Sequence, residues 1–281
     1  MTDAATTAKA RLLRELHDQP VLVLPNAWDP VSAALVARAG AAAIATTSGG
    51  VAWSLGRPDG EGLTRDEMMA AVRRIAAAVD VPVTADVEGG YGPTPEDVAA
   101  TVRATLGAGA VGVNVEDSRA EDGTLLSVDE QAQRIQAARD AAASAGVPEF
   151  VVNARTDVYL RQVGDPAGRL DDVLARADGY AKAGADCLFV PGLLDLDTLR
   201  TLTAASPLRV NAMARPGGPT VAELAAVGVR RISVGTAVAQ AAYAVAQRAA
   251  QELLETGTYR ALDQMLSYPE LNALFATQRR R

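Results

Sequence analysis

Short apolar runs alternate with longer runs of helical period along most of the chain. We predict eight strands from the apolar runs, in the segments VLVLPN (21–26), AAIATTSGG (42–50), VPVTADVEGG (81–90), AVGVNVED (110–117), EFVVNARTD (149–157), DCLFVPG (186–192), LRVNAMARP (208–216) and RRISVGTAV (230–238). Alternation of strands with helices is typical of parallel strands joined by crossover connections. The pattern therefore predicts an α/β protein with a parallel sheet.

The predicted helices begin and end with recognisable signals. Four of them start at a Thr or Ser that an acid follows three residues later, which is the capping-box pattern. These pairs are Thr64 with Glu67, Ser127 with Glu130, Thr220 with Glu223 and, as a looser version around Pro95, Thr94 with Asp97. At the other end, Gly separates a helix from the next strand in RAGAAAI, GAGAVGV, KAGADCLF and AVGVRRISV.

The series of strand–helix units contains no Pro-, Gly- or Ser-rich linker, so we predict a single domain over residues 1–281. Eight such units close into a (β/α)8 barrel (a TIM barrel), which needs about 250 residues. A doubly wound open sheet is the alternative. Beyond the last strand we predict a C-terminal helical extension, about 240–281, that covers the barrel or exchanges with a neighbouring subunit.

Composition narrows the class of protein. Hydrophobic residues make up 49% of the chain and charged residues 22%, which is enough apolar material for a large core. The net charge of -7 argues against a nucleic-acid-binding surface, and we interpret the basic run at 279–281 as a solvated tail. No apolar stretch reaches the ~20 residues of a membrane span, and the N-terminus lacks a secretory signal. We expect a cytoplasmic protein without membrane partners.

The single cysteine and the single histidine limit the available chemistry. Cys187 lies in the apolar run DCLFV, where we expect a buried thiol, and it cannot form an internal disulfide. His17 lies in a predicted N-terminal helix, away from the barrel interior. These positions argue against a histidine metal cage and against a Ser-His-Asp triad.

Acidic residues gather where the predicted strands end, which is where barrels place their chemistry. Asp86 and Glu88 share one face of a strand because strand side chains alternate, and Glu116 ends the next strand. Enclosed carboxylates repel each other unless a counter-charge is present. With no histidine nearby, they suit a hard divalent cation, Mg²⁺ or Mn²⁺, held partly through water. The alternative is an acid cluster that Arg155 alone neutralises.

Two further segments at these strand ends can contact an anion. We expect the SGG turn at 48–50 to leave backbone N–H groups accessible to a carboxylate or phosphonate, with a plain turn as the alternative. Arg155 ends its strand and offers a permanent bidentate contact, with an ordinary ion pair to the acids as the alternative.

Six motifs resemble the isocitrate lyase/phosphoenolpyruvate mutase superfamily, in family order and at family-like spacing. They are NAWDPVSA (26–33), TTSGG (46–50), GRPDG (56–60), ADVEGGYG (85–92), GVNVEDS (112–118) and NARTD (153–157). The resemblance implies a barrel whose last helix is swapped between subunits, a homo-oligomer (dimer or tetramer) and Mg²⁺ dependence.

The resemblance also implies roles for individual positions. Four acids match the metal-site acids of the superfamily. The resemblance also implies that two of them, Asp59 and Glu116, are catalytic residues together with Arg155. The matching metal-site acids are Asp59, Asp86, Glu88 and Glu116. The matching substrate contacts are Trp28, Thr46, Ser48, Gly49, Gly50 and Asn211.

Departures from the family patterns leave the reaction open. The segment EDSRAEDGTLLS (116–127) replaces the Cys-containing loop of isocitrate and methylisocitrate lyases, and the mutase loop E-D-K-x-x-P-K-x-N-S is absent as well. Asn114 stands where methylisocitrate lyases have His, and FVPGL (189–193) lacks the lyases' strand-six acid. We interpret 118–126 as a substrate lid, with a simple surface loop as the alternative, and Arg119 and Asp122 are the groups to test.

One main hypothesis and two alternatives follow. We predict a Mg²⁺-dependent lyase that cleaves or forms a C–C bond in a small 2-oxo or 2-hydroxy dicarboxylic acid through a metal-bound enolate. The first alternative is a phosphonate-active mutase or hydrolase that acts on a P–C bond. The second is a metal-dependent 2-oxo-acid-binding protein without turnover. In each case the expected partner is a small-molecule carboxylate.

Overall fold

The computed structural model describes residues 4–120 and 122–276, and these residues form the predicted barrel. Within them, parallel strands make one sheet in the order β1-β9-β8-β7-β6-β5-β4-β3-β2. The strands are β1 (Leu22–Leu24), β2 (Asn26–Ala27), β3 (Ile44–Thr46), β4 (Val83–Asp86), β5 (Gly112–Glu116), β6 (Val151–Arg155), β7 (Cys187–Phe189), β8 (Arg209–Met213) and β9 (Arg231–Ser233). The α/β barrel is confirmed, and the open-sheet alternative is wrong.

The first predicted strand is split at Pro25, and this split closes the barrel. β1 pairs with β9 and β2 pairs with β3, so the two halves bond to opposite ends of the sheet. Proline has no N–H to donate to a ladder. Asn26 bridges the split, because its side-chain nitrogen donates to the Thr46 carbonyl (2.9 Å) and its side-chain oxygen accepts from the Val234 N–H (2.9 Å).

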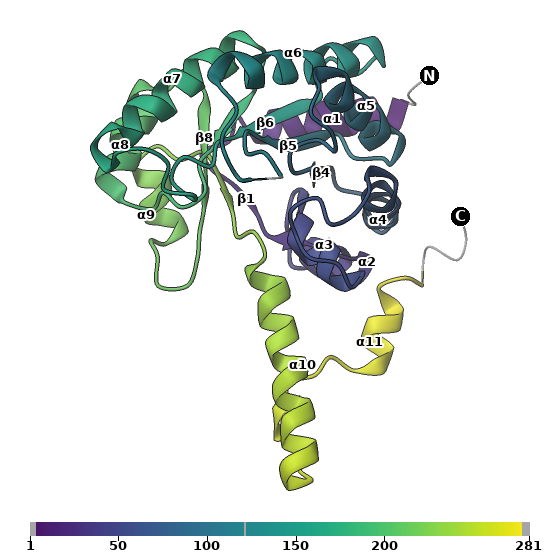
Figure 1. Ribbon diagram of the computed structural model, residues 1–281. Helices are drawn as coiled ribbons and strands as arrows, with labels where there is room; N and C mark the ends of the chain where they lie inside the picture. The colour runs from purple at the N-terminus through teal and green to yellow at the C-terminus, as the bar shows by residue number, and fades with distance from the viewer. Residues whose placement is uncertain (1–3, 121, 277–281) are drawn as a thin grey trace.

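Helices between the strands cover the outside of the barrel (Figure 1). They are α2 (Pro30–Arg38), α3 (Ser48–Ser54), α4 (Arg65–Ala77), α5 (Pro95–Gly107), α6 (Val128–Ser144), α7 (Arg169–Lys182), α8 (Leu196–Ala205) and α9 (Val221–Ala226), with the 3-10 helix η1 (Pro166–Gly168). A further helix, α1 (Ala4–Leu16), precedes the first strand. All four predicted capping boxes are present, at the starts of α4, α5, α6 and α9. The local signals therefore set these helix boundaries.

The core is built mainly from Ala, Val, Leu and Ile, and Cys187 is buried in it as predicted. One prediction about the interior is wrong, because His17 enters the barrel. α1 packs against the N-terminal end of β6, where Arg14 donates to the Phe150 carbonyl (3.3 Å). The His17 side chain that follows α1 is only 4% exposed, and its Nε2 lies 3.2 Å from Nη1 of Arg231 on β9.

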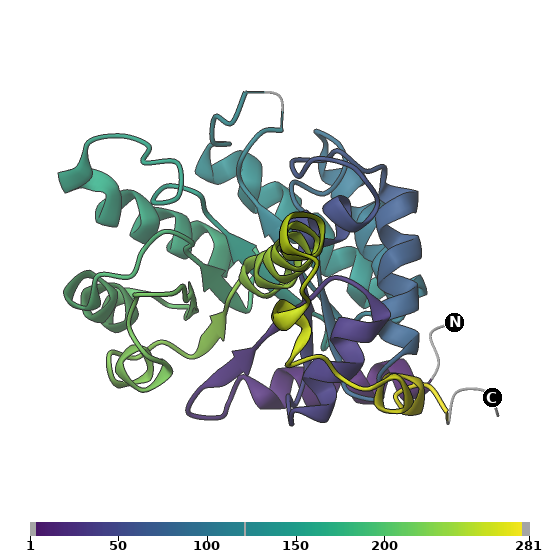
Figure 2. The same cartoon turned by 90° about the horizontal axis from the view of Figure 1, so that it is seen from below.

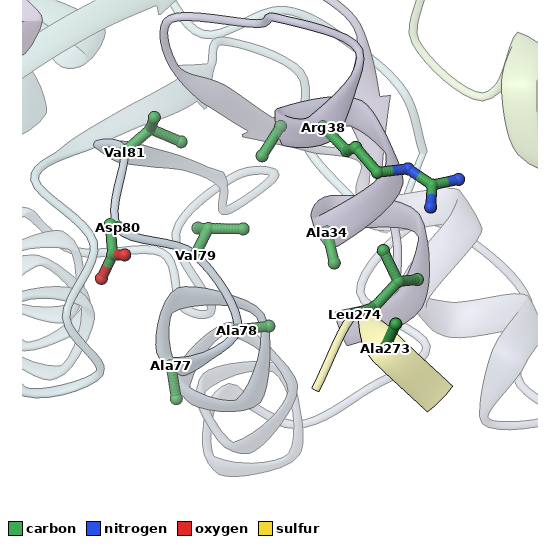
Figure 3. Close-up of a pocket in the computed structure, with 10 residues that line it drawn as sticks. Ala34, Arg38, Ala77, Ala78, Val79, Asp80, Val81, Ala273 and Leu274 are labelled. Carbon is green, nitrogen blue, oxygen red and sulfur yellow. The ribbon is translucent and has the colours of Figure 1, made fainter. Parts of the chain in front are cut away.

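The C-terminal extension consists of α10 (Ala237–Thr256), the 3-10 helix η2 (Arg260–Leu262) and α11 (Tyr268–Ala273). α10 projects away from the barrel and buries only Ala239, and Figure 2 shows this helix almost end-on. The chain then turns back, and α11 lies beside α2 and α4 across a hollow of about 690 Å³ lined by Ala34, Val79 and Leu274 among others (Figure 3).

Two further predictions concern a membrane-spanning segment and the basic C-terminal tail. None of the helices within 4–120 and 122–276 is long and apolar enough to cross a membrane. The basic run at 279–281 lies outside the described residues.

Candidate active site

Most of the predicted site residues come together at the C-terminal ends of neighbouring strands. Asp86 ends β4, Glu116 ends β5 and Arg155 ends β6. Glu116 and Arg155 are direct partners in the strand ladder, and Glu88 follows β4 by two residues. Side chains at one register position on adjacent parallel strands point to the same side of the sheet, so these groups share the mouth of the barrel.

Asp86 is held from two sides and keeps one oxygen unpaired. Its Oδ2 accepts from the main-chain N–H of Ser48 (3.0 Å), and its own N–H donates to Oγ1 of Thr46 (2.8 Å). Its Oδ1 is buried without a hydrogen-bond partner. A buried carboxylate oxygen without a donor is costly, so this atom fits a site that binds a cation.

The SGG segment is the first turn of α3 and not the free turn that we predicted. The helix begins directly after Thr47, which takes extended backbone angles. A Cβ on Gly49 would lie 2.9 Å from Oδ2 of Asp59, and one on Gly50 would lie 2.8 Å from Cβ of Trp28. The two glycines therefore allow the neighbouring side chains to approach closely. The contact of their N–H groups with an anion stays a prediction.

Asp59 reaches the site from the loop before α4. Its carboxylate accepts a hydrogen bond from the Ser48 side chain. The loop is exposed, but the carboxyl group turns inward, and its burial raises the pKa of Asp59, with the charge of Asp86 as the next cause. Ser48 thus contacts two of the predicted acids, Asp59 through its hydroxyl and Asp86 through its N–H.

Glu88 is buried beside the same acids in a strained backbone conformation. Its φ of 51° is in the left-handed region, and such strain is typical of functional sites. Its carboxylate accepts from the Tyr91 hydroxyl (3.2 Å) and from the Glu61 N–H. Burial raises the pKa of Glu88 to about 8, and Asp86, together with other nearby carboxylates, adds to the rise. The site therefore lacks positive charge around this residue.

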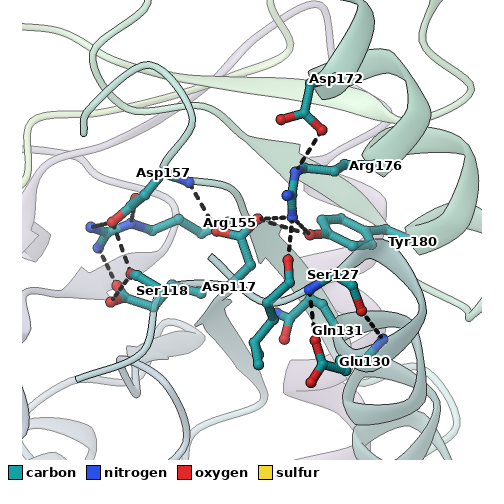
Figure 4. A network of polar contacts seen from close by, with 12 residues as sticks. Asp117, Ser118, Ser127, Glu130, Gln131, Arg155, Asp157, Asp172, Arg176 and Tyr180 are labelled. Carbon is teal, nitrogen blue, oxygen red and sulfur yellow. Dashed lines mark hydrogen bonds and ion pairs between the residues drawn. The ribbon is translucent and has the colours of Figure 1, made fainter. Parts of the chain in front are cut away.

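Arg155 is clamped between two carboxylates (Figure 4). Its Nη1 lies 2.7 Å from Oε2 of Glu116, and its Nε and Nη2 donate to the two oxygens of Asp157 (2.6 and 2.9 Å). Ser118 Oγ bridges the same carboxylates, 2.7 Å from Glu116 and 3.0 Å from Asp157. Burial raises the pKa of Glu116 to about 7 despite the neighbouring Arg155. The guanidinium has five N–H groups, so these contacts leave two for a ligand.

A second polar layer supports this clamp from behind. Asp117 is wholly buried and accepts from the Asp157 N–H (3.0 Å), from Nη1 of Arg176 (2.8 Å) and from the Tyr180 hydroxyl (2.8 Å). Arg176 also donates to the carbonyl of Leu126 at the end of the predicted lid (2.9 Å). The lid and the arginine clamp are therefore fixed to the same anchor.

Three predicted substrate contacts lie elsewhere or are already engaged. Thr46 is wholly buried and uses its hydroxyl on Asp86, as described above. The Asn211 amide is also buried, where its oxygen accepts from Asn153 (3.0 Å) and its nitrogen donates to main-chain carbonyls. Trp28 faces Tyr243 of α10, with ring centroids 6.3 Å apart. Their roles toward a substrate stay predictions.

The predicted lid folds back on itself. Ser118 and Leu125 form an isolated antiparallel bridge. Arg119 pairs with Glu130 (3.0 Å), and Asp122 accepts from the hydroxyl and the N–H of Thr124 (2.7 and 2.9 Å). The Thr124 hydroxyl is the main cause that lowers the pKa of Asp122, so this group is ionised and turned toward its own loop.

Several residues of the site were not singled out from the sequence. Asp157 carried a signal, because it follows Arg155 by two residues and therefore returns toward the same side. Ser118 lies within the strand-end motif GVNVEDS, but nothing in the motif ranks it above its neighbours. Asn114, in the same motif, was marked only as the residue that stands where methylisocitrate lyases have His. Arg176 and Tyr180 lie on α7, far away in sequence, so no local pattern relates them to the site.

The acids fit a divalent cation in part. Within the described residues, no three Asp, Glu, His or Cys side chains lie close enough together to hold one metal ion directly. However, the unpaired Oδ1 of Asp86 and the raised pKa values of Asp59, Glu88 and Glu116 all indicate a site that is short of positive charge. Mg²⁺ commonly binds through one or two carboxylates and retains waters, so this donor set suits it.

The fold and the site together define an α/β-barrel protein with an acidic, arginine-containing site at the C-terminal ends of its strands. The chain belongs to the phosphoenolpyruvate phosphomutase (PEP_mutase) family, whose model matches residues 13–254, and thus to the phosphoenolpyruvate mutase/isocitrate lyase superfamily. The resemblance of the six motifs is confirmed.

Close relatives carry general names. A putative phosphonomutase from Burkholderia cenocepacia J2315 is 47% identical over 90% of this chain and 100% of that chain, with a TM-score of 0.82. A putative lyase/mutase from the same organism is 39% identical over 97% and 98%, with a TM-score of 0.89. Uncharacterized protein MT2054 of Mycobacterium tuberculosis is 38% identical over 92% of this chain and 94% of its own length.

Other relatives have specific names, and these cover more than one reaction. The 2,3-dimethylmalate lyase of Eubacterium barkeri is 30% identical over 98% of this chain and 95% of its own length. A phosphonopyruvate hydrolase, whose structure contains oxalate and Mg²⁺, is 25% identical over 97% of this chain and 96% of that chain, with a TM-score of 0.84. Relatives of this chain thus include C–C lyases as well as enzymes named for phosphonates.

Proposed function

We propose that this chain is a Mg²⁺-dependent C–C lyase for a small 2-oxo or 2-hydroxy dicarboxylic acid. The observation that carries the proposal is the placement of Arg155, with two uncommitted N–H groups, next to acids of which one presents an unpaired buried oxygen. An arrangement of this kind binds an oxygen-rich anion and stabilises charge that develops on it.

The proposed reaction gives each group a task. For a 2-hydroxy acid, the hydroxyl loses its proton and the C2–C3 bond breaks, which leaves a carbonyl at C2. The electron pair of the broken bond moves onto the departing carboxylate fragment as an enolate, which then takes a proton at C3 from water. Arg155 stabilises this negative charge with its two remaining N–H groups. Asp59 takes the hydroxyl proton, because its raised pKa makes it a better base than an ordinary aspartate.

Mg²⁺ would be held by Asp86 directly and by Glu88 and Glu116 through water. When bound, it supplies Lewis-acid polarisation of the substrate oxygens. Ser48, Gly49 and Gly50 at the start of α3 lie beside Asp86 and contact the substrate carboxylate in this proposal, while Arg119 and Asp122 belong to the lid that closes over it.

P–C bond chemistry is the second candidate. The family model is named for a phosphomutase, and the 47% identical structure is named a putative phosphonomutase. Because an enolate serves both reactions, the arginine and the acids suit either one. The substrate therefore has to be identified by experiment.

A substrate panel tests the proposal. We expect one of the two dicarboxylic acids, oxaloacetate or 2,3-dimethylmalate, to be cleaved in the presence of Mg²⁺, with the products read by NMR. 2-Methylisocitrate, a tricarboxylic acid, is included as a larger comparison. Conversion of phosphonopyruvate with no cleavage of the dicarboxylic acids would instead establish the second candidate. If every compound survives while 2-oxo acids still raise the melting temperature with Mg²⁺, the chain is a binding protein and not an enzyme.

We also propose that the chain works as a homo-oligomer in which α10 is exchanged. A hollow of about 760 Å³ beside β1 and α2 has a mostly apolar lining that includes Leu16, Val21 and Val36. In a complete barrel a helix after the last strand packs in this region, but α10 leaves it open. A helix from a second copy is the occupant that we propose.

A further inference from the structure

Arg231 is a buried charge that crosses the barrel interior. Its side chain starts on β9 and is 0% exposed, and its Nη2 donates to Oδ1 of Asn114 on β5 (3.2 Å). Three strands separate β9 from β5 in the sheet order, so the two lie on opposite sides of the closed barrel. No acid forms an ion pair with Arg231 in the part of the chain that the structure describes. A charge this costly to bury needs a reason.

The histidine below Arg231 is fixed in one neutral form. Nδ1 of His17 lies 2.7 Å from the Leu13 carbonyl, which can only accept, so Nδ1 carries the hydrogen. Nε2 then has a free lone pair, and it accepts from Nη1 of Arg231 at 3.2 Å. Burial, followed by the charge of Arg231, lowers the pKa of His17 to about 3, which agrees with this neutral form. His17 therefore holds Arg231 without adding charge.

Above Arg231, the Asn114 amide has a defined orientation. A guanidinium has no acceptor atom, so the Asn114 atom that faces it must be the oxygen. A second donor, Nδ2 of Asn153, reaches the same oxygen at 2.7 Å. Rotation of the amide by half a turn would bring its N–H groups against both donors, so this rotation is disfavoured. The NH₂ group of Asn114 must point the other way.

That other direction is the candidate active site. Asn114 and Asp86 are direct partners in the ladder of β4 and β5, so their side chains lie side by side. Each is 8% exposed, whereas Asn153 and Asn211 deeper in the barrel are 0% exposed. The NH₂ group of Asn114 thus opens toward the same space as the unpaired Oδ1 of Asp86.

We propose that Arg231, held by neutral His17, is a positioning residue that locks Asn114 with its NH₂ group toward the substrate. This inference rests on the proposed function, because it assumes an anionic oxygen ligand beside Asp86. A freely rotating asparagine could present its oxygen to that ligand and repel it. The buried arginine, together with Nδ2 of Asn153, removes this second orientation, so that Asn114 always offers a donor.

Oxalate binding in the presence of Mg²⁺ tests the proposal. We expect wild-type protein to bind oxalate in calorimetry and Asn114→Ala to bind it about tenfold more weakly, as for one hydrogen bond to a charged ligand. Arg231→Met should weaken oxalate about fivefold in the wild-type background and have no further effect in the Asn114→Ala background. Arg231→Lys, which keeps a donor, should restore much of the affinity. Arg230→Met is the matched control, since Arg230 is exposed and bonds to the Pro20 carbonyl.

A second pair of variants keeps the test informative if Arg231→Met does not fold. His17→Gln retains a neutral acceptor and should bind oxalate as wild type does, whereas His17→Leu should weaken it. The inference would be overturned if Arg231→Met lowered the oxalate affinity equally in the wild-type and the Asn114→Ala backgrounds. Unchanged oxalate binding in all folded variants would overturn it as well. Failure of the wild-type protein to bind oxalate with Mg²⁺ would overturn the proposed function itself. Mn²⁺ affinity, measured separately, shows whether a variant acts through the cation.

Discussion

At the scale of single residues, the site depends on which N–H groups of the Arg155 guanidinium already bond to protein carboxylates and which do not. Glu116 and Asp157 fix the guanidinium in its plane, and Ser118 joins the two carboxylates. This geometry requires a planar group whose donors lie on several nitrogen atoms. Lysine has a single nitrogen and therefore cannot replace the guanidinium. The direction of the two remaining N–H groups is therefore a property of the whole clamp.

We expect Arg155→Lys to lower kcat about 100-fold, because the ammonium group cannot bond to both carboxylates and to the developing charge at once. Steady-state kinetics on the substrate identified by the panel provides the measurement. Arg161→Lys is the matched control, since Arg161 also lies near Asp157 (3.4 Å) but is more exposed, and it should leave kcat within about twofold. A wild-type kcat for Arg155→Lys would contradict the proposed role.

We expect Gly49→Ala to lower activity about tenfold while the protein stays folded. The added methyl group would lie 2.9 Å from Oδ2 of Asp59 and 2.9 Å from Cγ2 of Thr236, so the Asp59 side chain should shift and lose its position, and Thr236 must also give way. Activity and the melting temperature should be measured together. Gly107→Ala at the end of α5 meets nothing within 4 Å, so it should leave activity unchanged. Equal activities would show that Asp59 is not needed where it lies.

The sequence could predict single residues only when a local pattern marked them. Asp86, Glu116 and Arg155 end apolar runs, and these ends meet in any barrel. Thr46 and Asn211 fit the same pattern, but their side chains contact other parts of the protein and not an open site. Which partner a polar group finds depends on strands far apart in sequence, and that information is not local.

At the scale of elements, helix boundaries were predictable because their signals are local. A capping box involves residues three apart, and all four predicted boxes form. The docking of α1 was not predictable in this way, because it depends on the barrel that the helix closes. For this reason the sequence predicts His17 in an N-terminal helix away from the barrel interior, whereas its side chain is buried there.

The docking of α1 should depend on pH through His17. A histidine whose pKa falls to about 3 on folding is protonated more easily in the unfolded chain, so stability is lost as the pH falls from about 6.5 toward 3. Protonation would place a cation against Arg231, with Arg209 and Arg14 also nearby. We expect a loss of up to about 1.4 kcal/mol per pH unit from this group.

Urea unfolding of the wild type and of His17→Gln between about pH 7 and about pH 5 measures this contribution. The glutamine does not titrate, so the difference in unfolding free energy between the two proteins should change as the pH falls. Parallel pH profiles would show that His17 does not change its protonation preference on folding.

At the scale of the whole molecule, the contacts within one copy of the chain explain the C-terminal extension least. α10 is mostly exposed, and large apolar side chains on the extension face solvent. They include Leu253, Leu254, Tyr259, Met265 and Tyr268. Exposed apolar groups collected on one arm are typical of an interface with another chain.

We expect Leu254→Glu to weaken the homo-oligomer. Leu254 is 86% exposed in one copy, and a charge placed there would be costly to bury against a partner. Light scattering over a range of protein concentrations measures the mass. Leu12→Glu on α1 is the matched control, because Leu12 is also exposed but lies outside the extension. An unchanged mass for Leu254→Glu would place the interface elsewhere.

The split at Pro25 has a consequence for how the chain is made. Among the described strands β1 pairs with β9 alone, and the bridge from Asn26 to Val234 joins residues 208 apart. During synthesis from the N-terminus, the first strand therefore stays unpaired until almost the whole barrel has left the ribosome. Open strand edges pair with other chains, so the nascent protein is most exposed to aggregation just before its last strand emerges.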